Sequence, residues 1–305
     1  MEELRFLEEQ NVSPELIKRV EEFRQAYPVK EEAAGRIMKP SIPFYGKEIL
    51  EMAIAAILQG QNLLLTGPKA TGKNILAENL AYIFNRPSYN VSFHVNTNSG
   101  DLIGTDTFED NEVKLRKGSI YQCAQEGGFG ILDEINMAKN EALAVLHATL
   151  DFRRAIDVPG YDRVEVDEAA RFIGTMNYGY AGTRELNEAL TSRFVVIQMP
   201  TIGQEGLERL LVDEFPTLEK KYRQQFAQLF LDLQKKCESA EISSKALDLR
   251  GLLAALHLIE KGIPSGQALD LGIINKAFEP FERQLVADAV WARLPKDATR
   301  DKLFD

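Results

Sequence analysis

The chain has 305 residues, 45% of them hydrophobic and 27% charged, which is the balance of a globular protein with one or two domains. A formal net charge of −10 argues against indiscriminate binding to nucleic acids or anionic membranes, although a local basic patch is compatible with it. The two cysteines, Cys123 and Cys237, lack the spacing of a disulfide framework or a zinc site. The amino terminus has acidic residues in place of a signal-peptide core, and no run reaches the roughly 18 apolar residues of a membrane span, so we expect a cytoplasmic protein.

The first forty residues predict a helical extension. A helix start is indicated at Ser13 and Pro14, and an amphipathic pattern continues to about Ala26 before several prolines break it. We interpret residues 1–40 as a helical N-terminal extension and linker. It either packs against the main domain or docks a partner.

The following segment combines a strand, a glycine-containing loop and a helix. Residues 62–66 form an apolar run suited to a buried parallel strand, and residues 75–84 have apolar side chains at helical spacing. Between them lies the sequence Gly67-Pro68-Lys69-Ala70-Thr71-Gly72-Lys73-Asn74-Ile75. In the pattern G-x-x-x-x-G-K-[ST], backbone N–H groups surround phosphate oxygens, the lysine reaches the outer phosphates and the hydroxyl binds Mg²⁺. We therefore predict a phosphate-binding loop over residues 67–75, the alternative being a turn that binds nothing.

Position 74 departs from this pattern. Asn74 offers an amide oxygen to Mg²⁺ where a compact hydroxyl is usual, so the metal geometry and the rate of hydrolysis are in question. Phosphate binding through Gly72 and Lys73 is not affected by this change.

Two acidic residues follow a strand predicted over residues 127–132. Asp133 can hold Mg²⁺ directly or through water, and Glu134 can polarise the water that attacks the γ-phosphorus of a nucleotide. Alone, such a pair is more often a surface feature. Its place at the end of a strand that follows a phosphate loop favours the functional interpretation.

The rest of the first two hundred residues alternates strands and helices. Further strands are predicted over residues 88–95, 171–175 and 195–199, with helices over 47–58 and 138–150. This alternation predicts an α/β fold with a doubly wound parallel sheet that binds its ligand at the carboxyl ends of the strands. The phosphate-binding loop after its first strand is typical of a P-loop NTPase.

Two segments interrupt the alternation of strands and helices, and the pattern becomes purely helical near residue 200. Residues 107–115 and 154–166 have turn residues between short alternating arms and predict inserted β-hairpins. After Pro200 only helical patterns occur, over residues 206–212, 219–237, 243–261, 263–275 and 278–291. We therefore expect an α/β nucleotide-binding domain over residues 41–200 and a small all-helical lid domain over residues 201–305.

Three polar residues are further candidates for the site. Asn177 ends the strand that begins near Arg171, and its amide can bond the γ-phosphate or the attacking water. Arg193 and Arg250 are candidate stabilisers of the charge that develops during phosphoryl transfer. Taken singly, such an asparagine is more often a turn residue and such an arginine a surface ion-pair partner.

The order of these motifs resembles that of the AAA+ ATPases, over about residues 42 to 290. Four stretches are similar to the MoxR branch in particular: Asp101-Leu102-Ile103-Gly104, Asp133-Glu134-Ile135-Asn136-Met137-Ala138, Phe172-Ile173-Gly174-Thr175-Met176-Asn177 and Leu190-Thr191-Ser192-Arg193-Phe194. The two inserted hairpins also fall where that branch carries its inserts.

The resemblance implies roles for these residues. Residues 67–74 would be Walker A, Asp133 and Glu134 Walker B, Asn177 sensor 1, and Arg250 sensor 2 in the lid. Arg193 would be an arginine finger that reaches the nucleotide of a neighbouring subunit, which implies a ring of identical chains, usually a hexamer. The segment 44–46 would lie beside the adenine, and Asn96 or Asn98 would orient Glu134.

The resemblance also implies an activity. Members of this branch use ATP and Mg²⁺ for chaperone-like remodelling or activation of a partner, often a protein with a von Willebrand factor A domain, and the hairpins are candidates for substrate contact. Two alternatives stay open: a ring-forming nucleotide switch that hydrolyses little because of Asn74, and a nucleic-acid-linked NTPase, which the lack of a basic segment near the hairpins disfavours.

Overall fold

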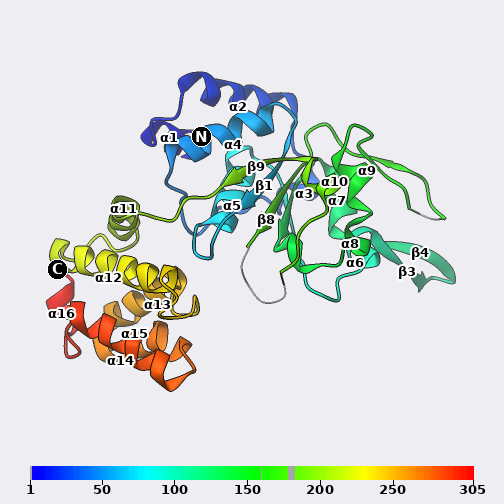
Figure 1. Ribbon diagram of the computed structural model, residues 1–305. Helices are drawn as coiled ribbons and strands as arrows, with labels where there is room; N and C mark the ends of the chain where they lie inside the picture. The colour runs from blue at the N-terminus through cyan, green and yellow to red at the C-terminus, as the bar shows by residue number, and fades with distance from the viewer. Residues whose placement is uncertain (1, 159, 178–182) are drawn as a thin grey trace. The chain divides into compact units, whose positions relative to one another are not determined.

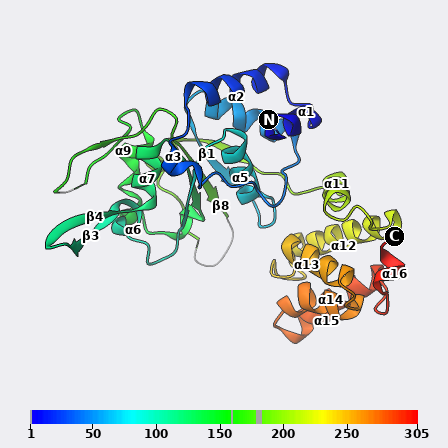
Figure 2. The ribbon, with the colours of Figure 1, turned by 180° about the vertical axis from the view of Figure 1, so that it is seen from behind.

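The computed structural model describes residues 2–158, 160–177 and 183–305, and it divides into two compact units (Figures 1 and 2). The first unit is Met1–Pro200 and the second is Thr201–Asp305. No helix in the described ranges is long and apolar enough to cross a membrane.

A five-stranded sheet forms the centre of the first unit. Its strands are β1 (Asn62–Thr66), β2 (Ser88–Ser92), β5 (Phe129–Asp133), β8 (Arg171–Met176) and β9 (Phe194–Gln198). They lie in the order β2-β5-β8-β1-β9, and every pair is parallel. This arrangement confirms the predicted α/β fold with a doubly wound parallel sheet. All strands therefore end at one edge of the sheet, the carboxyl edge, and begin at the opposite, amino edge.

Both faces of the sheet are covered, which explains why β1 is buried at every position. Leu63 and Leu65 point into one core and Leu64 into the other, because successive side chains of a strand alternate between faces. The first core contains α1 (Glu2–Glu9), α2 (Pro14–Ala26), α4 (Lys47–Leu58) and α5 (Lys73–Ile83). The second contains α6 (Ser99–Ile103), α7 (Ser119–Glu126) and α9 (Leu146–Leu150).

The N-terminal helices share the first core with the sheet. Phe23 of α2 packs edge-on against Phe84 with 5.1 Å between ring centroids, and Phe84 in turn contacts Phe129 of β5. A short helix, α3 (Glu31–Ala34), follows. The hydrophobic face of α2 is therefore part of the packing that supports the sheet.

Several predicted elements differ from those observed. Strand β2 ends at Ser92 and not at 95, because its partner β5 ends opposite it at Asp133. The helix predicted over residues 138–150 is two short helices, α8 (Asn140–Leu143) and α9, which a turn at residues 144–145 separates, and η1 (Ile135–Met137) precedes them. Helix α7 was not predicted, and α10 (Glu188–Thr191) is a single turn before β9.

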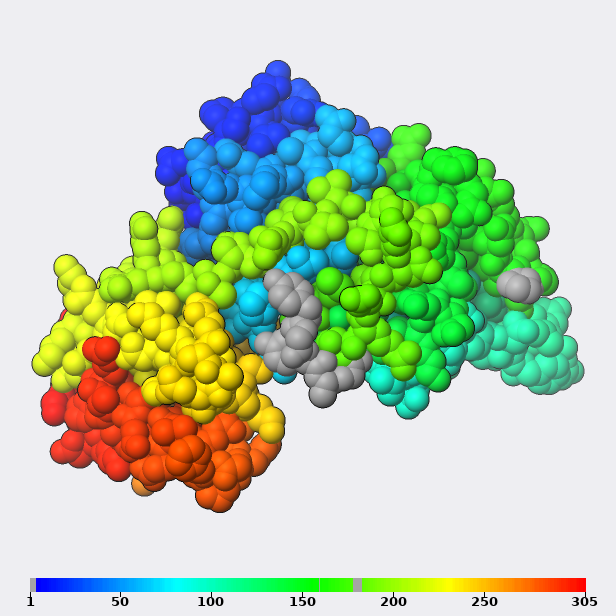
Figure 3. Space-filling view, viewed as in Figure 1, coloured from blue at the N-terminus to red at the C-terminus, as the bar shows by residue number. Residues whose placement is uncertain are grey.

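Both hairpins are present. The first pairs β3 (Gly104–Glu109) with β4 (Glu112–Lys117) through Asp110 and Asn111, whose positive φ angles of 55° and 64° suit a tight hairpin turn. This hairpin protrudes at the margin of the first unit (Figures 1 and 3). The second pairs only β6 (Ala155–Ile156) with β7 (Val164–Glu165), and Pro159 of its predicted turn lies outside the described residues. Tyr161 of the second hairpin donates a hydrogen bond to Asp106 of the first over 2.7 Å.

The named elements of the second unit are all helices. These are α11 (Gln204–Glu214), α12 (Lys220–Glu238), α13 (Leu249–Glu260), α14 (Ser265–Gly272), η2 (Ile274–Lys276), α15 (Pro280–Arg293) and α16 (Arg300–Leu303). Helices α13 and α14 pack closely at Gly251 and Gly272, where a Cβ on Gly251 would lie 2.2 Å from the Gly272 carbonyl oxygen. Helix α13 starts six residues later than predicted, at Leu249 rather than residue 243.

Candidate functional site

The predicted phosphate loop joins the end of β1 to the start of α5 at the carboxyl edge of the sheet. Gly67, Ala70 and Gly72 have positive φ angles of 152°, 60° and 78°. At Gly67 a Cβ would lie 3.0 Å from the carbonyl oxygen of Met199, a tight approach at a φ that side chains rarely adopt, so this position favours glycine. A loop that alternates between left-handed and right-handed backbone, followed by a helix N-terminus, turns its N–H groups toward an anion.

Lys73 is the first residue of α5, and its side chain is folded back into the loop. Its Nζ donates to the carbonyl oxygens of Gly67 and Pro68, over 2.9 and 2.6 Å, and to Thr71 Oγ1 over 3.2 Å. Only 7% of the residue is exposed. Burial lowers the pKa of Lys73 to about 8, and the carboxylates of Asp133 and Glu134 partly oppose this shift. The loop thus holds an amine whose charge is sensitive to a nearby anion.

Asp133 and Glu134 lie where the end of β5 meets β8. Thr175 Oγ1 donates to Asp133 Oδ1 over 2.7 Å and accepts from the Glu134 backbone N–H over 3.1 Å. Asn177 Nδ2 donates to Glu134 Oε1 over 3.1 Å. Glu134 has a φ of 54°, a conformation that costs energy for a residue with a side chain and that occurs often at functional sites. Hydrogen bonds from β8 therefore hold both acidic residues.

A buried asparagine supports the position of Asn177. Asn136 is 2% exposed, and its Nδ2 donates to the Asn177 carbonyl oxygen over 2.6 Å. Within the described residues its Oδ1 has no hydrogen-bond partner. Sequence reasoning gave no role to Asn136 or Thr175, although both belong to stretches on which the resemblance depends.

The segment predicted to lie beside the adenine is fixed next to the loop. Asn79 of α5 accepts from the Phe44 backbone N–H over 3.2 Å and donates to the carbonyl oxygens of Ile42 and Ile75, over 2.9 and 2.8 Å. A Cβ on Gly72 would lie 3.4 Å from the Phe44 ring. Asn79, another residue that the sequence did not single out, thus ties the segment before α4 to the phosphate loop.

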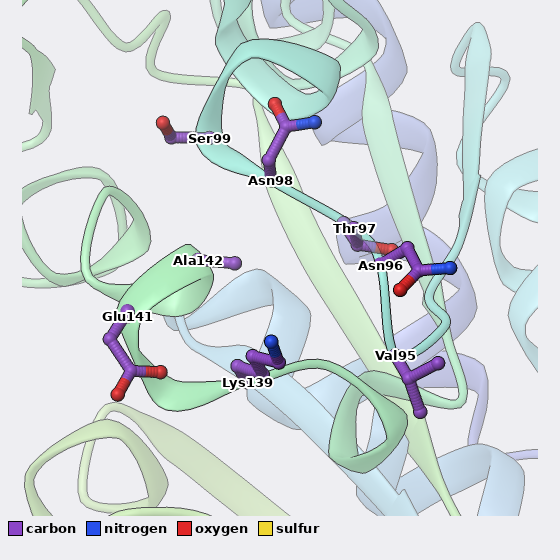
Figure 4. Close-up of a pocket in the computed structure, with 8 residues that line it drawn as sticks. All are labelled: Val95, Asn96, Thr97, Asn98, Ser99, Lys139, Glu141 and Ala142. Carbon is purple, nitrogen blue, oxygen red and sulfur yellow. The ribbon is translucent and has the colours of Figure 1, made fainter.

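Asn96 and Asn98 lie on the segment after β2, in a pocket of about 410 Å³ (Figure 4). Figure 4 shows this segment facing Lys139 and Ala142 across the pocket. Asn98 caps α6 by accepting from the Asp101 backbone N–H over 3.1 Å. The amide that bonds Glu134 is that of Asn177, so the predicted orienting role of Asn96 or Asn98 has no counterpart in these contacts.

Arg193 lies away from these residues. It immediately precedes β9 and is therefore at the amino edge of the sheet, opposite the edge that carries the loop and the two acids. Its guanidinium bonds Asp151 Oδ2 over 3.0 Å and the His147 carbonyl oxygen over 3.1 Å, and it also donates to the carbonyl oxygen of Ala189. The structure thus brings Lys73, Asp133, Glu134 and Asn177 together and leaves Arg193 apart.

Arg250 belongs to the second unit. It lies in the first turn of α13, where Asp248 Oδ1 accepts from its backbone N–H over 3.0 Å, and its side chain is exposed. Asp248 also pairs with Lys276. A role for Arg250 at the nucleotide stays a prediction.

The side-chain oxygen atoms of Asp133 and Asn74 are suited to a magnesium ion that binds together with a nucleotide. No group of three or more His, Cys, Asp or Glu side chains that could hold a metal occurs among the described residues. Mg²⁺ at nucleotide sites typically uses one or two protein oxygens, with phosphates and water as its other ligands. Asp133, whose charge acts on Lys73, and Asn74, the residue after Lys73, are both half-buried and fit this requirement.

Comparison with known proteins agrees with this architecture. Residues 62–194 match the model of the AAA domain (dynein-related subfamily), a nucleotide-binding domain. The chain belongs to the AAA+ ATPase family.

The alignments with similar proteins cover most of this chain. Uncharacterized protein YojN of Bacillus subtilis (strain 168) is 34% identical, over 78% of this chain and 80% of the relative. Uncharacterized protein SERP0979 of Staphylococcus epidermidis is 31% identical, over 79% and 94%. Uncharacterized protein SAB1265c of Staphylococcus aureus is 33% identical, over 75% and 89%.

Proposed function

We propose that this chain is an ATPase of the MoxR type that binds ATP at residues 67–75 and hydrolyses it with Glu134 as the base. The observation that carries this proposal is the convergence of Lys73, Asp133, Glu134 and Asn177 at the carboxyl edge of one sheet. The hydrogen bond from Asn177 to Glu134 supports it further, because a bonded carboxylate keeps one orientation toward an attacking water.

The chemistry follows from these positions. Glu134 accepts a proton from water as the water oxygen attacks the γ-phosphorus, and the bond from that phosphorus to the bridging oxygen breaks, leaving ADP with the electron pair. Lys73 leaves its contacts with Gly67 and Pro68 to neutralise the outer phosphates. Mg²⁺, held by Asp133 and Asn74, would supply charge neutralisation on the phosphates.

The biological role is proposed from the same resemblance. The chain would assemble into a ring, with six copies as the usual number, in the cytoplasm, and use ATP to remodel or activate a partner such as a protein with a von Willebrand factor A domain. The hairpin β3–β4 suits substrate contact, because Phe108 and Val113 pair across it and are 71% and 62% exposed. Exposed apolar side chains of this kind are typical of interaction sites.

Phosphate release by the purified chain tests the proposal, with Lys73→Ala as the comparison. We expect steady release from ATP by the wild type, and loss of both ATP binding and release in the variant, while its thermal midpoint without nucleotide stays close to that of the wild type. A wild type that releases no phosphate with any divalent metal contradicts hydrolysis.

The same assay separates the two alternatives. Tight ATP binding without release favours the nucleotide switch, in which Asn74 lacks the hydroxyl that usually binds Mg²⁺. A preference for GTP, or stimulation of release by DNA, favours the nucleic-acid-linked NTPase instead.

A further inference from the structure

A second arginine lies beside Arg193 on the same carboxylate. Asp151 Oδ2 accepts from Arg193 Nη2 over 3.0 Å and from Arg153 Nη2 over 2.7 Å, and Asp151 Oδ1 accepts from Arg153 Nε over 3.1 Å. The backbone N–H of Arg153 also donates to Asp151 Oδ1 over 3.0 Å. One negative charge thus aligns two guanidinium groups, and the cluster keeps a net positive charge.

This cluster is fixed at the amino edge of the sheet. Asn62, the first residue of β1, donates from Nδ2 to the Leu150 carbonyl oxygen over 3.2 Å and accepts from the Phe172 backbone N–H over 2.9 Å. Asp151 follows Leu150 directly, and Arg193 precedes the pair formed by Phe194 with Asn62. The buried amide of Asn62 therefore holds the end of α9, and with it Asp151, against the start of the strands.

The chain's own phosphate loop is out of reach of this cluster. Strand β1 runs from Asn62, beside the cluster, to Thr66, which directly precedes the loop. At about 3.3 Å per residue, the four steps separate the two edges by about 13 Å. Arg193 and Arg153, held at the amino edge, are therefore placed to contact the nucleotide of another molecule rather than that of their own chain.

The surface around the cluster is suited to a second copy of this chain. Phe152, between Asp151 and Arg153, is 92% exposed, and aromatic and arginine side chains are enriched at the centres of protein interfaces. A second copy offers charge of the opposite sign at its carboxyl edge, where a bound triphosphate would lie with Asp133 and Glu134. Charge complementarity therefore favours contact between this surface and the nucleotide-bound edge of a neighbouring copy.

A contribution to folding stability does not explain why Arg153 pairs with Asp151 beside Arg193. The Arg153 side chain is 47% exposed, against 21% for Arg193, and an exposed ion pair contributes about 0 to 1 kcal/mol. Hydrogen bonds from Arg153 also hold the pKa of Asp151 well below its usual range, so this carboxylate stays ionised and keeps both arginines aligned. The Nη1 group of Arg153 is not used in any of the bonds to Asp151 and can donate to phosphate oxygens.

We propose that Arg153 enters the triphosphate site of a neighbouring copy together with Arg193, and that Asp151 is the positioning residue for both. This inference rests on the proposed ATPase function and adds to it a second residue acting between subunits. It also assigns the surface formed by Phe152, Arg153 and Arg193 to self-association.

Single variants give the first test. We expect Arg153→Ala to lower kcat by about tenfold or more with ATP binding nearly unchanged, because the chain's own loop is intact. Asp151→Ala should lower kcat in the same way, and Asp151→Glu should recover part of it. Arg300→Ala is the matched control, since Arg300 is 51% exposed and also pairs with a nearby aspartate, Asp301. Wild-type kcat in Arg153→Ala overturns the inference.

Mixing variants tests action between subunits. Arg153→Ala keeps an intact loop and Glu134, whereas Glu134→Gln keeps both arginines, so an equimolar mixture restores complete sites and should exceed the mean of the two separate rates. A mixture of Arg153→Ala with Arg193→Ala should show no gain, because every interface then lacks one arginine of the pair. No gain in the first mixture, or an equal gain in both, overturns the inference. Absence of turnover in the wild type overturns the ATPase proposal instead.

Discussion

Thr175 donates a hydrogen bond to Asp133 over 2.7 Å, from one strand of the sheet to its neighbour. The same hydroxyl oxygen accepts from the backbone N–H of Glu134 over 3.1 Å. A single side chain, only 1% exposed, therefore fixes both the proposed metal ligand and the proposed base. Its loss should affect metal use and hydrolysis while leaving the phosphate loop intact.

Thr175→Val removes the hydroxyl at nearly constant volume. We expect a fall in kcat of about 10- to 100-fold and a higher Mg²⁺ requirement, because partners of metal-ligating residues have effects of this size. Thr175→Ser keeps the hydroxyl and should retain most of the activity. The measurement is phosphate release against Mg²⁺ concentration, and superimposable curves for wild type and Thr175→Val would rule out this role.

The lowered pKa of Lys73 predicts pH-dependent nucleotide binding. Burial holds this pKa at about 8 in the free protein, whereas a bound phosphate favours the charged form and raises it. Below about pH 8 the lysine is already charged and affinity should be flat. Above it, binding must take up a proton, so affinity should fall with rising pH, approaching about tenfold per unit.

Titration with a fluorescent ATP analogue from about pH 7 to about 9.5 measures this effect on both sides of the Lys73 pKa. Lys73→Arg, which stays charged throughout, is the control and should show a flat profile if it binds. A profile for the wild type that is as flat as that of the control would show that Lys73 does not titrate on binding.

Asn74→Thr restores the hydroxyl that the usual loop pattern carries. We expect turnover to rise severalfold, because the hydroxyl is a compact Mg²⁺ ligand and the asparagine amide is not. The test compares kcat of the two proteins at saturating Mg-ATP, with Asn74→Ala as the variant that offers no side-chain ligand. An unchanged rate in Asn74→Thr would remove the idea that Asn74 slows hydrolysis.

Phe23→Ala tests whether helix α2 is part of the structural core. Phe23 is 7% exposed and packs against Phe84, so its truncation should reduce the free energy of unfolding by about 3 to 5 kcal/mol. Phe108→Ala, at an exposed position, should change it by about 0.5 kcal/mol or less. Urea denaturation followed by circular dichroism measures both, and equal small effects would mean that α2 does not stabilise the sheet.

The sheet and the phosphate loop were predictable because their signals are local. A strand, a glycine-containing loop and a helix occupy consecutive residues, and each strand carries its own apolar run. Helix α7 was missed because its glycine flanks and short length resemble a loop, and the helix over 138–150 was overestimated because a turn at residues 144–145 separates α8 from α9.

The supporting residues of the site were not predictable in the same way. Thr175 and Asn79 have the appearance of ordinary strand and helix residues until the fold places them beside Asp133 and Phe44. Asp151 contacts an arginine 42 positions away, a distance at which sequence spacing carries no information. The polar contacts that orient a site arise from tertiary packing, whereas the residues proposed for its chemistry follow recognisable patterns.

Glu134 is the residue that we propose to activate water for attack on bound ATP. The direct measurement is the identity of the nucleotide that stays bound after wild type and Glu134→Gln are each incubated with Mg-ATP and separated from free nucleotide. We predict mainly ADP on the wild type and ATP on Glu134→Gln, because the glutamine keeps the shape of the side chain but cannot accept the proton. ADP on both proteins, formed at the same rate, would show that Glu134 is not the base.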